Sequence, residues 1–542
     1  MDIATANPGT TAREYDVLVV GAGVAGLYQL HRLRQLGKKV RVLDAAKEVG
    51  GTWYWNCYPG ARVDSQSYIY QYWFSQDLIE GWSWSERFPG QGETERYLNY
   101  VADRLDLRKD IEFETRVKAA HWEESSGSWR VLTDRDETLR TRFLVSCTGM
   151  LSAPLPPPYP GHEHYKGIVA HTARYPRTGI ELKGKRVGVI GTGATGIQVI
   201  QTIAPEVAQL TVFQRTPQYA VPMRNPKFTE ADCKAYKAHA PALRERVNNT
   251  FAGFDFDFEN GSWYDKTPAE RLAVLEKIWA DGSLSFWVGG FPELLTDERC
   301  NAEVSEFVRG KIRARLREPA LAAKLVPTDY GFGTYRVPLE TRYYDAFNQD
   351  NVELVDLKQT PLECFTEKGL RTTAKEYDLD VVILATGFDA GTGALTRMDI
   401  HGRDGLSLTA EWGKDIRSTL GLQVHGFPNL FTVAGPLAPS TAFCNMTTCL
   451  QQQVDWVTDC IAFLDRTGRR SVEPSREKQD EWVRHHDEVA NATLLVRTKS
   501  WYTGANVAGK PIRLLSYVGG VGRYRKVCDE VQASGYRGFV MQ

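Results

Sequence analysis

Two glycine-rich segments have the spacing that binds the pyrophosphate of a dinucleotide. Each reads Gly-x-Gly-x-x-Gly, follows an apolar run typical of a strand and precedes a helical pattern. Glycines at these places permit a tight turn and a close approach of the backbone to phosphates at a helix N-terminus. They are Gly21, Gly23 and Gly26 in the first segment and Gly191, Gly193 and Gly196 in the second. Two such segments predict an enzyme that moves electrons between two bound dinucleotides.

The residue that ends the next strand distinguishes the two predicted sites. Asp44 follows the first segment, and a carboxylate there accepts hydrogen bonds from ribose hydroxyls. Arg215 stands at the equivalent place after the second segment, where a guanidinium suits the 2′-phosphate of NADP. We therefore expect FAD at the first site and NADPH at the second. Either side chain could instead be an ordinary polar residue at the end of a strand.

Composition limits the remaining classes of function. The chain has 542 residues and a formal net charge of −1, which predicts two or three domains and no nucleic-acid or membrane partner. No apolar run is long enough to span a membrane, and the N-terminal residues lack the pattern of a secretory signal. The nine cysteines include no Cys-x-x-Cys, which favours reduced thiols in the cytoplasm. We expect a cytoplasmic monomer or weak oligomer without a metal site.

The elements that carry these motifs alternate between strands and helices, as in an α/β fold with parallel sheets. Two Rossmann-like domains and a helical insertion account for the pattern. Within the insertion, Leu272, Leu275 and Trp279 recur at helical spacing and predict the buried face of a helix over 269–279. Whether the insertion covers the active site or lies outside it stays open at this point. The predicted divisions are an FAD-binding part over 1–148 and 381–542, a linker with the NADP-binding part over 149–224 and 331–380, and the insertion over 225–330.

Two further segments resemble a known family. Residues 50–62, Gly-Gly-Thr-Trp-Tyr-Trp-Asn-Cys-Tyr-Pro-Gly-Ala-Arg, and residues 500–507, Ser-Trp-Tyr-Thr-Gly-Ala-Asn-Val, are similar to type I Baeyer–Villiger monooxygenases. The resemblance runs from about residue 14 to the end and is closest to the phenylacetone and steroid monooxygenase branch. It implies an enzyme that uses FAD, NADPH and O2 to convert hydrophobic ketones to esters or lactones through a flavin C4a-peroxide. Oxidation of sulfides is a possible side activity of such an enzyme.

The resemblance assigns roles to particular residues. Arg336 aligns with the catalytic arginine, Asp64 with the acid that orients it, and Trp501 with a residue that closes over NADP. The loop 435–446 aligns with one beside the flavin, so that Leu437, Phe443 and Met446 are expected to contact substrate or simply to fill the core. Besides the six glycines, Asp44, Arg215, Asp64, Arg336 and Trp501, the expected cofactor-binding residues are Gly51, Thr52, Trp53, Tyr70, Thr192, Thr195 and Thr216.

Several positions depart from the family pattern. Tyr335 stands where a lysine usually contacts the NADP 2′-phosphate, and Cys57 replaces an arginine. The family fingerprint, here residues 165–177, retains its glycine, proline and His171 but has tyrosine at both aromatic positions. His171 could couple domain movement to catalysis or merely hold a turn. These departures leave an NADPH oxidase, or an N- or S-hydroxylating flavoenzyme, as the alternative. A non-catalytic nucleotide sensor is disfavoured by the retained Arg336 and Asp64.

Overall fold

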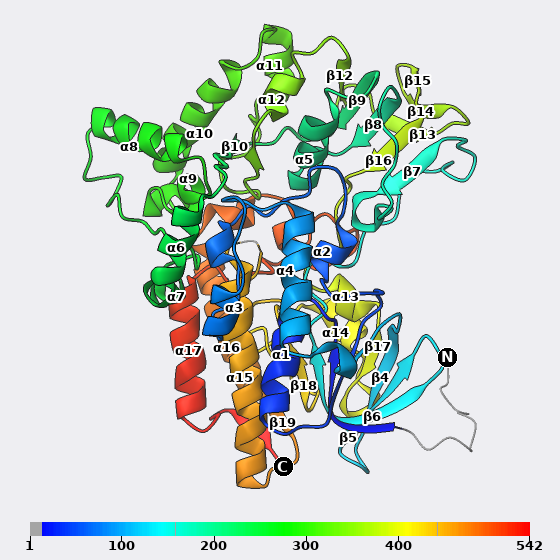
Figure 1. Cartoon of the computed structure of the whole chain (residues 1–542), viewed down its shortest axis with the longest axis vertical. Helices are drawn as coiled ribbons and strands as arrows, with labels where there is room; N and C mark the ends of the chain where they lie inside the picture. The colour runs from blue at the N-terminus through cyan, green and yellow to red at the C-terminus, as the bar shows by residue number, and fades with distance from the viewer. Residues whose placement is uncertain (1–12, 158, 442) are drawn as a thin grey trace.

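Two sheets form the framework of the chain (Figure 1). One glycine loop follows a strand of the first sheet, and the other follows a strand of the second. The computed structural model describes residues 13–157, 159–441 and 443–542. In Figure 1 the sheet that contains β8 and β9 lies above the sheet that contains β4 and β6. The α/β class and the two dinucleotide-binding folds agree with the sequence prediction.

The first sheet has eight strands in the order β17-β4-β5-β6-β1-β2-β3, with β18 also paired to β6. Its central strand, β1, pairs in parallel with both β2 and β6, so that the loop after β1 leaves the carboxyl edge of the sheet. As predicted, the segment around residue 430 returns to this sheet, because Leu430 pairs with Leu144. The strands are β1 Arg13–Val20, β2 Val40–Leu43, β3 Ile111–Glu112, β4 Val117–Glu123, β5 Ser128–Thr133, β6 Thr138–Ser146, β17 Asp399–His401 and β18 Leu430–Thr432.

Helices cover the first sheet and fix the position of its glycine loop. Helix α1 (Val24–Gln35) buries Leu27, Leu30 and Leu33 against the sheet. On its other side α1 lies next to the long helix α15 (Met446–Thr467), and Gln29 Nε2 donates a hydrogen bond of 3.0 Å to Thr458 Oγ1 (Figure 1). The other helices of this part are α2 Thr52–Trp55, α3 Gln76–Glu80, α4 Gln91–Arg104, α13 Gly393–Thr396, α14 Leu408–Lys414, α16 Arg476–Asn491 and α17 Val521–Ala533.

The second sheet is fully parallel, with the order β12-β9-β8-β16-β7. Helix α5 (Ala194–Ile203) follows β8, and buried Ile197, Ile200 and Ile203 hold it on the sheet. The sheet includes β16, so this unit extends a few residues past the division predicted at 380. The strands are β7 Ile168–His171, β8 Arg186–Ile190, β9 Gln209–Gln214, β12 Val352–Asp356 and β16 Val381–Leu384; the adjoining small sheet is β13 Leu362–Phe365, β14 Gly369–Thr372 and β15 Glu376–Asp378.

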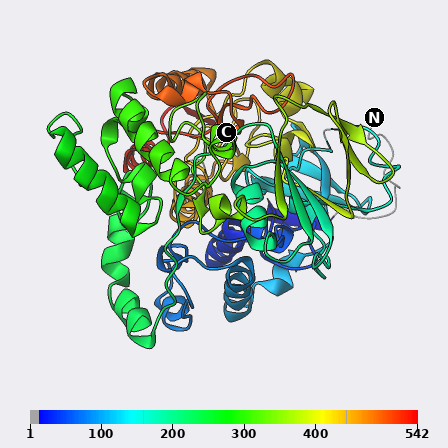
Figure 2. The same ribbon diagram turned by 90° about the horizontal axis from the view of Figure 1, so that it is seen from above.

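The segment between the two halves of the second unit is helical, and it stands at one side of the molecule (Figure 2). A capping box of Thr267 and Glu270 begins α8, which confirms the predicted helix. The predicted buried face was wrong in one residue. Leu272 is 52% exposed, because α8 faces the core through Leu275 and Ile278. The helices are α6 Glu230–Ala238, α7 Ala240–Asn249, α8 Pro268–Asp281, α9 Ser285–Val288, α10 Glu298–Arg313 and α11 Pro319–Leu325.

Short elements complete the described chain. Strands β10 Val221–Pro222 and β11 Leu339–Glu340 pair where the chain enters and leaves the insertion. Strands β19 Val472–Pro474 and β20 Phe539–Met541 pair near the C-terminus, and α12 spans Tyr343–Ala346. Across residues 13–157, 159–441 and 443–542, no helix is both long enough and apolar enough to cross a membrane.

The cysteines depart from the expectation of nine reduced thiols. Cys444 and Cys449 form a disulfide between the loop before α15 and the first turn of that helix. The remaining seven cysteines are free in the described structure. Sequence spacing could not predict this pair, because five residues separate its members and only the fold of the loop brings them together.

Candidate active site

The first glycine loop is shaped to receive a phosphate group. Gly21 has a φ of +105°, and a Cβ at this position would lie 2.6 Å from the carbonyl oxygen of Cys147. A Cβ at Gly26 would lie 1.8 Å from the carbonyl oxygen of Gly21, so α1 can approach the loop only with glycine there. Gly23 begins α1, and no side chain caps the amides of its first turn. Those N–H groups are available to a pyrophosphate, which fits the expected FAD.

Asp44 lies where a ribose-binding acid is expected. Its carboxylate accepts hydrogen bonds from the backbone N–H of Ala22 and, at 2.7 Å, from that of Ala46. Burial raises the pKa of this carboxyl, although the two N–H groups act in the opposite direction. The side chain therefore ties the end of β2 to the glycine loop.

The segment that resembles the family lies directly against this loop. A Cβ at Gly51 would come within 2.8 Å of the Cα of Gly23, so the two backbones touch. Gly51 is the N-cap residue of α2. The first residue of that helix, Thr52, is exposed, and the second, Trp53, is buried. Trp53 Nε1 donates to the hydroxyl of Tyr70 at 3.1 Å, and burial raises the pKa of Tyr70 to about 12. These predicted cofactor-binding residues thus surround one loop.

The second glycine loop repeats the geometry of the first. Gly191 has a φ of +106°, and a Cβ there would lie 2.5 Å from the carbonyl oxygen of Ala385. A Cβ at Gly196 would lie 2.1 Å from the carbonyl oxygen of Gly191. Gly193 begins α5 without a side-chain cap, and its Cβ direction points into open space. Uncapped amides facing an open region fit a second dinucleotide.

Residues around the second loop connect it to the end of β9. Thr192 Oγ1 donates to the carbonyl oxygen of Thr216 at 2.8 Å. Thr195 lies in the first turn of α5, and the hydroxyl of Tyr58, on the segment that follows α2, donates to Gln198 Oε1 of the same helix at 2.9 Å. Arg215 is exposed directly after β9. The second loop and the first therefore face a common region through Tyr58.

Tyr335 lies close enough to Arg215 for the two to interact electrostatically. Its hydroxyl donates to the carbonyl oxygen of Lys499 at 2.5 Å, and its ring meets Tyr330 edge-on at 4.4 Å. Burial raises the pKa of Tyr335, and the nearby Arg215 guanidinium partly offsets that rise. Tyr335 thus connects its own segment, which follows the insertion, to the C-terminal segment that carries Trp501.

Arg336 and Asp64 meet although 272 residues separate them. Arg336 Nη2 donates to Asp64 Oδ2 at 2.5 Å, and Nη1 donates to the carbonyl oxygen of Thr441 at 2.7 Å. Burial disfavours the charged guanidinium, but Asp64 and Tyr502 more than compensate, so the pKa of Arg336 is raised. The arginine is therefore a buried, fully charged cation with a fixed orientation.

Aromatic side chains enclose this cation. The Arg336 guanidinium lies 5.4 Å from the centre of the Trp287 ring, within the range of a cation–π interaction. Phe443 lies between Trp287 and Tyr502, at ring distances of 5.1 and 5.2 Å, and Tyr502 meets Trp501 at 4.4 Å. Trp287 Nε1 is buried with no hydrogen-bond partner among the described residues. Nε1 faces Gly333, because a Cβ on that glycine would lie 2.6 Å from it.

Sequence reasoning missed Trp287 and Tyr502. Trp287 lies on α9, a helix of four residues in the insertion, which is too short to show a periodic pattern. Tyr502 directly follows the predicted Trp501, so its position in the same segment was an available signal. The insertion therefore contributes a side chain that contacts Arg336.

The three predicted substrate residues separate in the structure. Phe443 joins the aromatic side chains around Arg336. Leu437 is fully buried in the core that α1 and α15 share, and Met446 contacts the disulfide of Cys444 and Cys449. Only Phe443 is therefore brought to the cation, while substrate contact by Leu437 and Met446 stays a prediction.

His171 and Cys57 both have structural contacts. His171 Nδ1 accepts the backbone N–H of Ala173 at 3.0 Å, and its Nε2 lies 3.3 Å from Thr386 Oγ1. Burial lowers the pKa of His171 to about 4, so the ring is neutral and holds the turn after β7. The Cys57 thiol donates to the carbonyl oxygen of Tyr175 at 3.2 Å.

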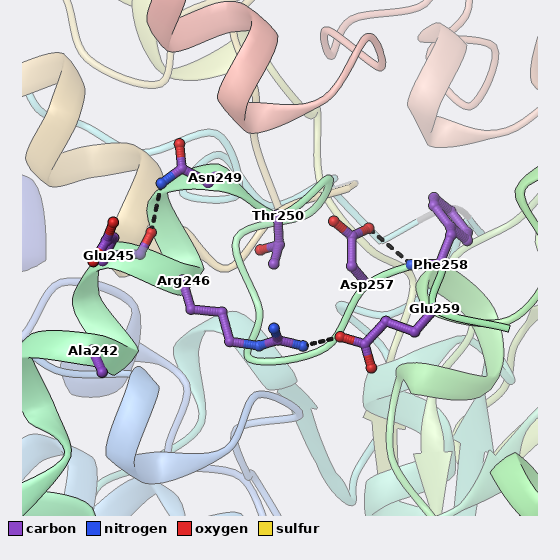
Figure 3. Close-up of a pocket in the computed structure, with 8 residues that line it drawn as sticks. All are labelled: Ala242, Glu245, Arg246, Asn249, Thr250, Asp257, Phe258 and Glu259. Carbon is purple, nitrogen blue, oxygen red and sulfur yellow. Dashed lines mark hydrogen bonds and ion pairs between the residues drawn. The ribbon is translucent and has the colours of Figure 1, made fainter. Parts of the chain in front are cut away.

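A separate hollow of about 670 Å³ lies within the insertion (Figure 3). It is lined by α7 and the loop after it, and the ion pair of Arg246 with Glu259 crosses it. Among the residues that the structure describes, its lining includes none of those predicted to bind cofactor or substrate. The lining residues are Ala242, Glu245, Arg246, Asn249, Thr250, Asp257, Phe258 and Glu259.

Two glycine loops, each leading from a parallel strand into an uncapped helix, together with an oriented guanidinium, are features of an oxidoreductase with two dinucleotide sites. Comparisons with known proteins narrow this class. The sequence profile of the flavin-binding monooxygenase-like family matches residues 14–224. An acetone monooxygenase (methyl acetate-forming) of Gordonia sp. (strain TY-5) is 54% identical, over 97% of this chain and 99% of the relative.

Solved structures give the same result. Oxidized steroid monooxygenase bound to NADP is 43% identical with a TM-score of 0.93, covering 97% of this chain and 99% of that one. The OTEMO complex with FAD and NADP is 39% identical with a TM-score of 0.94, covering 98% and 100%. The chain belongs to the Baeyer–Villiger monooxygenases, flavoenzymes that use FAD and NADPH to convert ketones to esters or lactones. The oxidase and heteroatom-hydroxylase alternative is not favoured.

Proposed function

We propose that this enzyme oxidises short-chain ketones such as acetone, with Arg336 as the cation beside the reacting oxygen. The balanced reaction consumes the ketone, O2, NADPH and one proton, and yields an ester, NADP⁺ and water. The observation that carries the proposal is the buried guanidinium of Arg336, which Asp64 and the Thr441 carbonyl fix beside the ring of Trp287.

FAD, when bound and reduced by NADPH, supplies the oxygen atom by reacting with O2. The protein's part is to stabilise the negative charge that develops on the ketone oxygen as the new C–O bond forms. Arg336 suits this task because its guanidinium stays charged at any working pH and is already oriented before substrate binds. Asp64 acts through Arg336, as a positioning residue.

Each cofactor has a distinct set of candidate ligands. For FAD we propose the first glycine loop with Asp44, Gly51, Thr52, Trp53 and Tyr70, supported by the backbone contact between Gly23 and Gly51. For NADPH we propose the second glycine loop with Arg215 and Thr216, supported by the uncapped first turn of α5. We also propose Asp64, Arg336 and Trp501 as residues that contact the cofactors, supported by the ion pair of Arg336 with Asp64 and by the packing of Trp501 on Tyr502.

The aromatic enclosure of Arg336 favours small substrates. Trp287, Phe443 and Tyr502 are each at most 4% exposed, so they leave little room beside the cation. A methyl ketone with short alkyl groups fits such a space more easily than a cyclic ketone does. The similarity to an acetone monooxygenase supports the same substrate class.

A substrate comparison tests this proposal. Wild type should form methyl acetate from acetone with a higher kcat/KM than it shows for lactone formation from cyclohexanone. Trp287→Ala should shift this ratio toward cyclohexanone. Trp279→Ala is the matched control, because Trp279 lies in the same insertion but packs on Phe286 and Phe307 instead of Arg336. Preference of the wild type for cyclohexanone, or an equal shift in both variants, would overturn the proposed substrate class.

We also infer that the enzyme acts in the cytoplasm as a monomer or weak oligomer. The seven free cysteines support a reducing compartment. Light scattering after size-exclusion chromatography should give a mass near 61.0 kDa at low protein concentration. A stable multiple of that mass under the same conditions would contradict the inference.

A further inference from the structure

Three side chains able to bind a metal ion gather at the edge of the first sheet, away from both glycine loops. β17 pairs in parallel with β4, and its register places His401 opposite His121 and Asp399 opposite Ala119. Ile400 is buried, so its neighbours Asp399 and His401 project from the opposite face of the strand. In the strand order, β5 and β6 separate β4 from β1, which leads into the first glycine loop.

The donor atoms of this cluster converge. The Asp399 carboxylate lies 2.9 Å from His121 Nε2 through one oxygen and 2.8 Å from His401 Nε2 through the other. The three donor atoms lie within 4.8 Å of one another, and the two imidazole rings are 4.7 Å apart. The side chains are 23% exposed for His121, 56% for Asp399 and 30% for His401, so an ion can enter from solvent.

A backbone carbonyl fixes the orientation of one ring. His401 Nδ1 lies 2.9 Å from the carbonyl oxygen of Gly405, and a carbonyl only accepts, so this nitrogen carries the hydrogen. A neutral imidazole has one such hydrogen, which leaves a lone pair on Nε2 facing the Asp399 carboxylate. At 2.8 Å from the carboxylate, that lone pair is satisfied either by a proton, which makes the ring an imidazolium, or by a metal ion. A ring nitrogen bound to a carbonyl while the other faces the ion is the usual support of a metal-binding histidine.

We propose that His121, Asp399 and His401 bind a divalent transition-metal ion, with Zn²⁺ as the best fit. Two imidazole nitrogens and one carboxylate oxygen are ligands that Zn²⁺ accepts, whereas Ca²⁺ and Mg²⁺ prefer oxygen alone. Tetrahedral bonds of about 2.0–2.2 Å place the ligand atoms about 3.3–3.6 Å apart, so the Asp399 carboxylate has to move away from both rings by about half an ångström or slightly more. Water would complete the coordination. Residue spacing could not predict this site, because 278 residues separate His121 from Asp399.

A metal ion at this site would hold the edge strand β17 against β4, where the chain returns from the second sheet to the first. β17 follows β16, the strand of the second sheet after which the chain returns to the first. An ion bound by residues of both β17 and β4 joins the returning segment to the first sheet. It would stabilise the folded chain without touching the residues that bind cofactor, since strands β5 and β6 lie between.

The test uses the holoenzyme without a histidine tag, stripped with a chelator and dialysed. Titration with Zn²⁺ in a calorimeter should show one saturable site per chain, and Co²⁺ should give the visible absorption of a nitrogen- and oxygen-bound ion. His401→Gln and Asp399→Asn should each weaken binding by about tenfold or more. Zn²⁺ should raise the thermal midpoint of the wild type but not of these variants. Flavin absorbance verifies that each variant is folded.

His164→Gln is the matched control. His162 and His164 flank Glu163 at 3.3 and 3.4 Å, so this exposed group also has two imidazoles and one carboxylate, but neither ring has a carbonyl partner among the residues that the structure describes. The control should bind Zn²⁺ as the wild type does. Absence of a saturable site in the wild type, or equal weakening by His164→Gln and His401→Gln, would overturn the proposal. Ketone oxidation should be unchanged by the chelator, so this result is independent of the proposed substrate.

Discussion

Replacing Asp64 by asparagine tests how much the enzyme depends on a fixed guanidinium. The carboxylate lies 2.5 Å from Arg336 Nη2, and its side chain is 25% exposed while that of Arg336 is 15% exposed. Asparagine keeps the shape but removes the charge. A hydrogen bond between charged groups contributes about 1.5–3 kcal/mol. Because about 1.4 kcal/mol corresponds to tenfold in rate, and solvent screens part of the interaction, we expect kcat for ester formation to fall about 10- to 50-fold.

The assay follows methyl acetate by gas chromatography together with NADPH consumption. Asp106→Asn is the control, because Asp106 forms an exposed ion pair with Lys109 and asparagine tolerates its positive φ. In an Arg336→Ala background, Asp64→Asn should cause little additional loss, since Asp64 acts through the arginine. A wild-type rate for Asp64→Asn, or losses that simply multiply in the double variant, would refute this reasoning.

Three further predictions concern the nucleotide loops and the linker. Tyr335→Lys should tighten NADP⁺ binding about tenfold by placing an ammonium near Arg215, as measured by calorimetry; unchanged affinity would exclude a phosphate contact. Gly191→Ala should lower the thermal midpoint because its Cβ meets a carbonyl, whereas Gly193→Ala should leave the midpoint unchanged and weaken only NADP⁺ binding. Because the pKa of His171 is lowered to about 4 from 6.5, the unfolded chain binds more protons between these pH values, and stability should fall as pH decreases through this window. His171→Gln should flatten this dependence in thermal melts; an identical slope in both proteins would contradict the assignment.

Local sequence patterns predicted the parts of the site that depend on backbone shape. At both loops, a Cβ on the first or third glycine would lie 2.6 Å or less from a carbonyl oxygen, so only glycine fits there. The short glycine motif was therefore enough to predict the shape of each loop. The position of Asp44 could also be predicted, because it lies at the end of the strand that directly follows the helix after the loop. Helix α8 was predicted correctly, but its spacing could not show that Leu272 faces solvent.

Local sequence patterns could not predict contacts between residues that lie far apart in the chain. No periodicity links Asp64 with Arg336, and only the resemblance to a family indicated that they meet. The ring of Trp287 reaches the same arginine from a four-residue helix in the insertion. These side chains converge because two sheets and an insertion pack around one point, and that packing is a property of the whole fold.

The central claim is that Arg336 is the cation that stabilises the reacting oxygen. The most direct measurement is the ratio of methyl acetate formed to NADPH consumed by Arg336→Ala, with hydrogen peroxide followed in parallel. We expect the variant to bind both cofactors and to consume NADPH, but to release peroxide and to form almost no ester. Ester formation by Arg336→Ala at the wild-type rate would contradict this expectation.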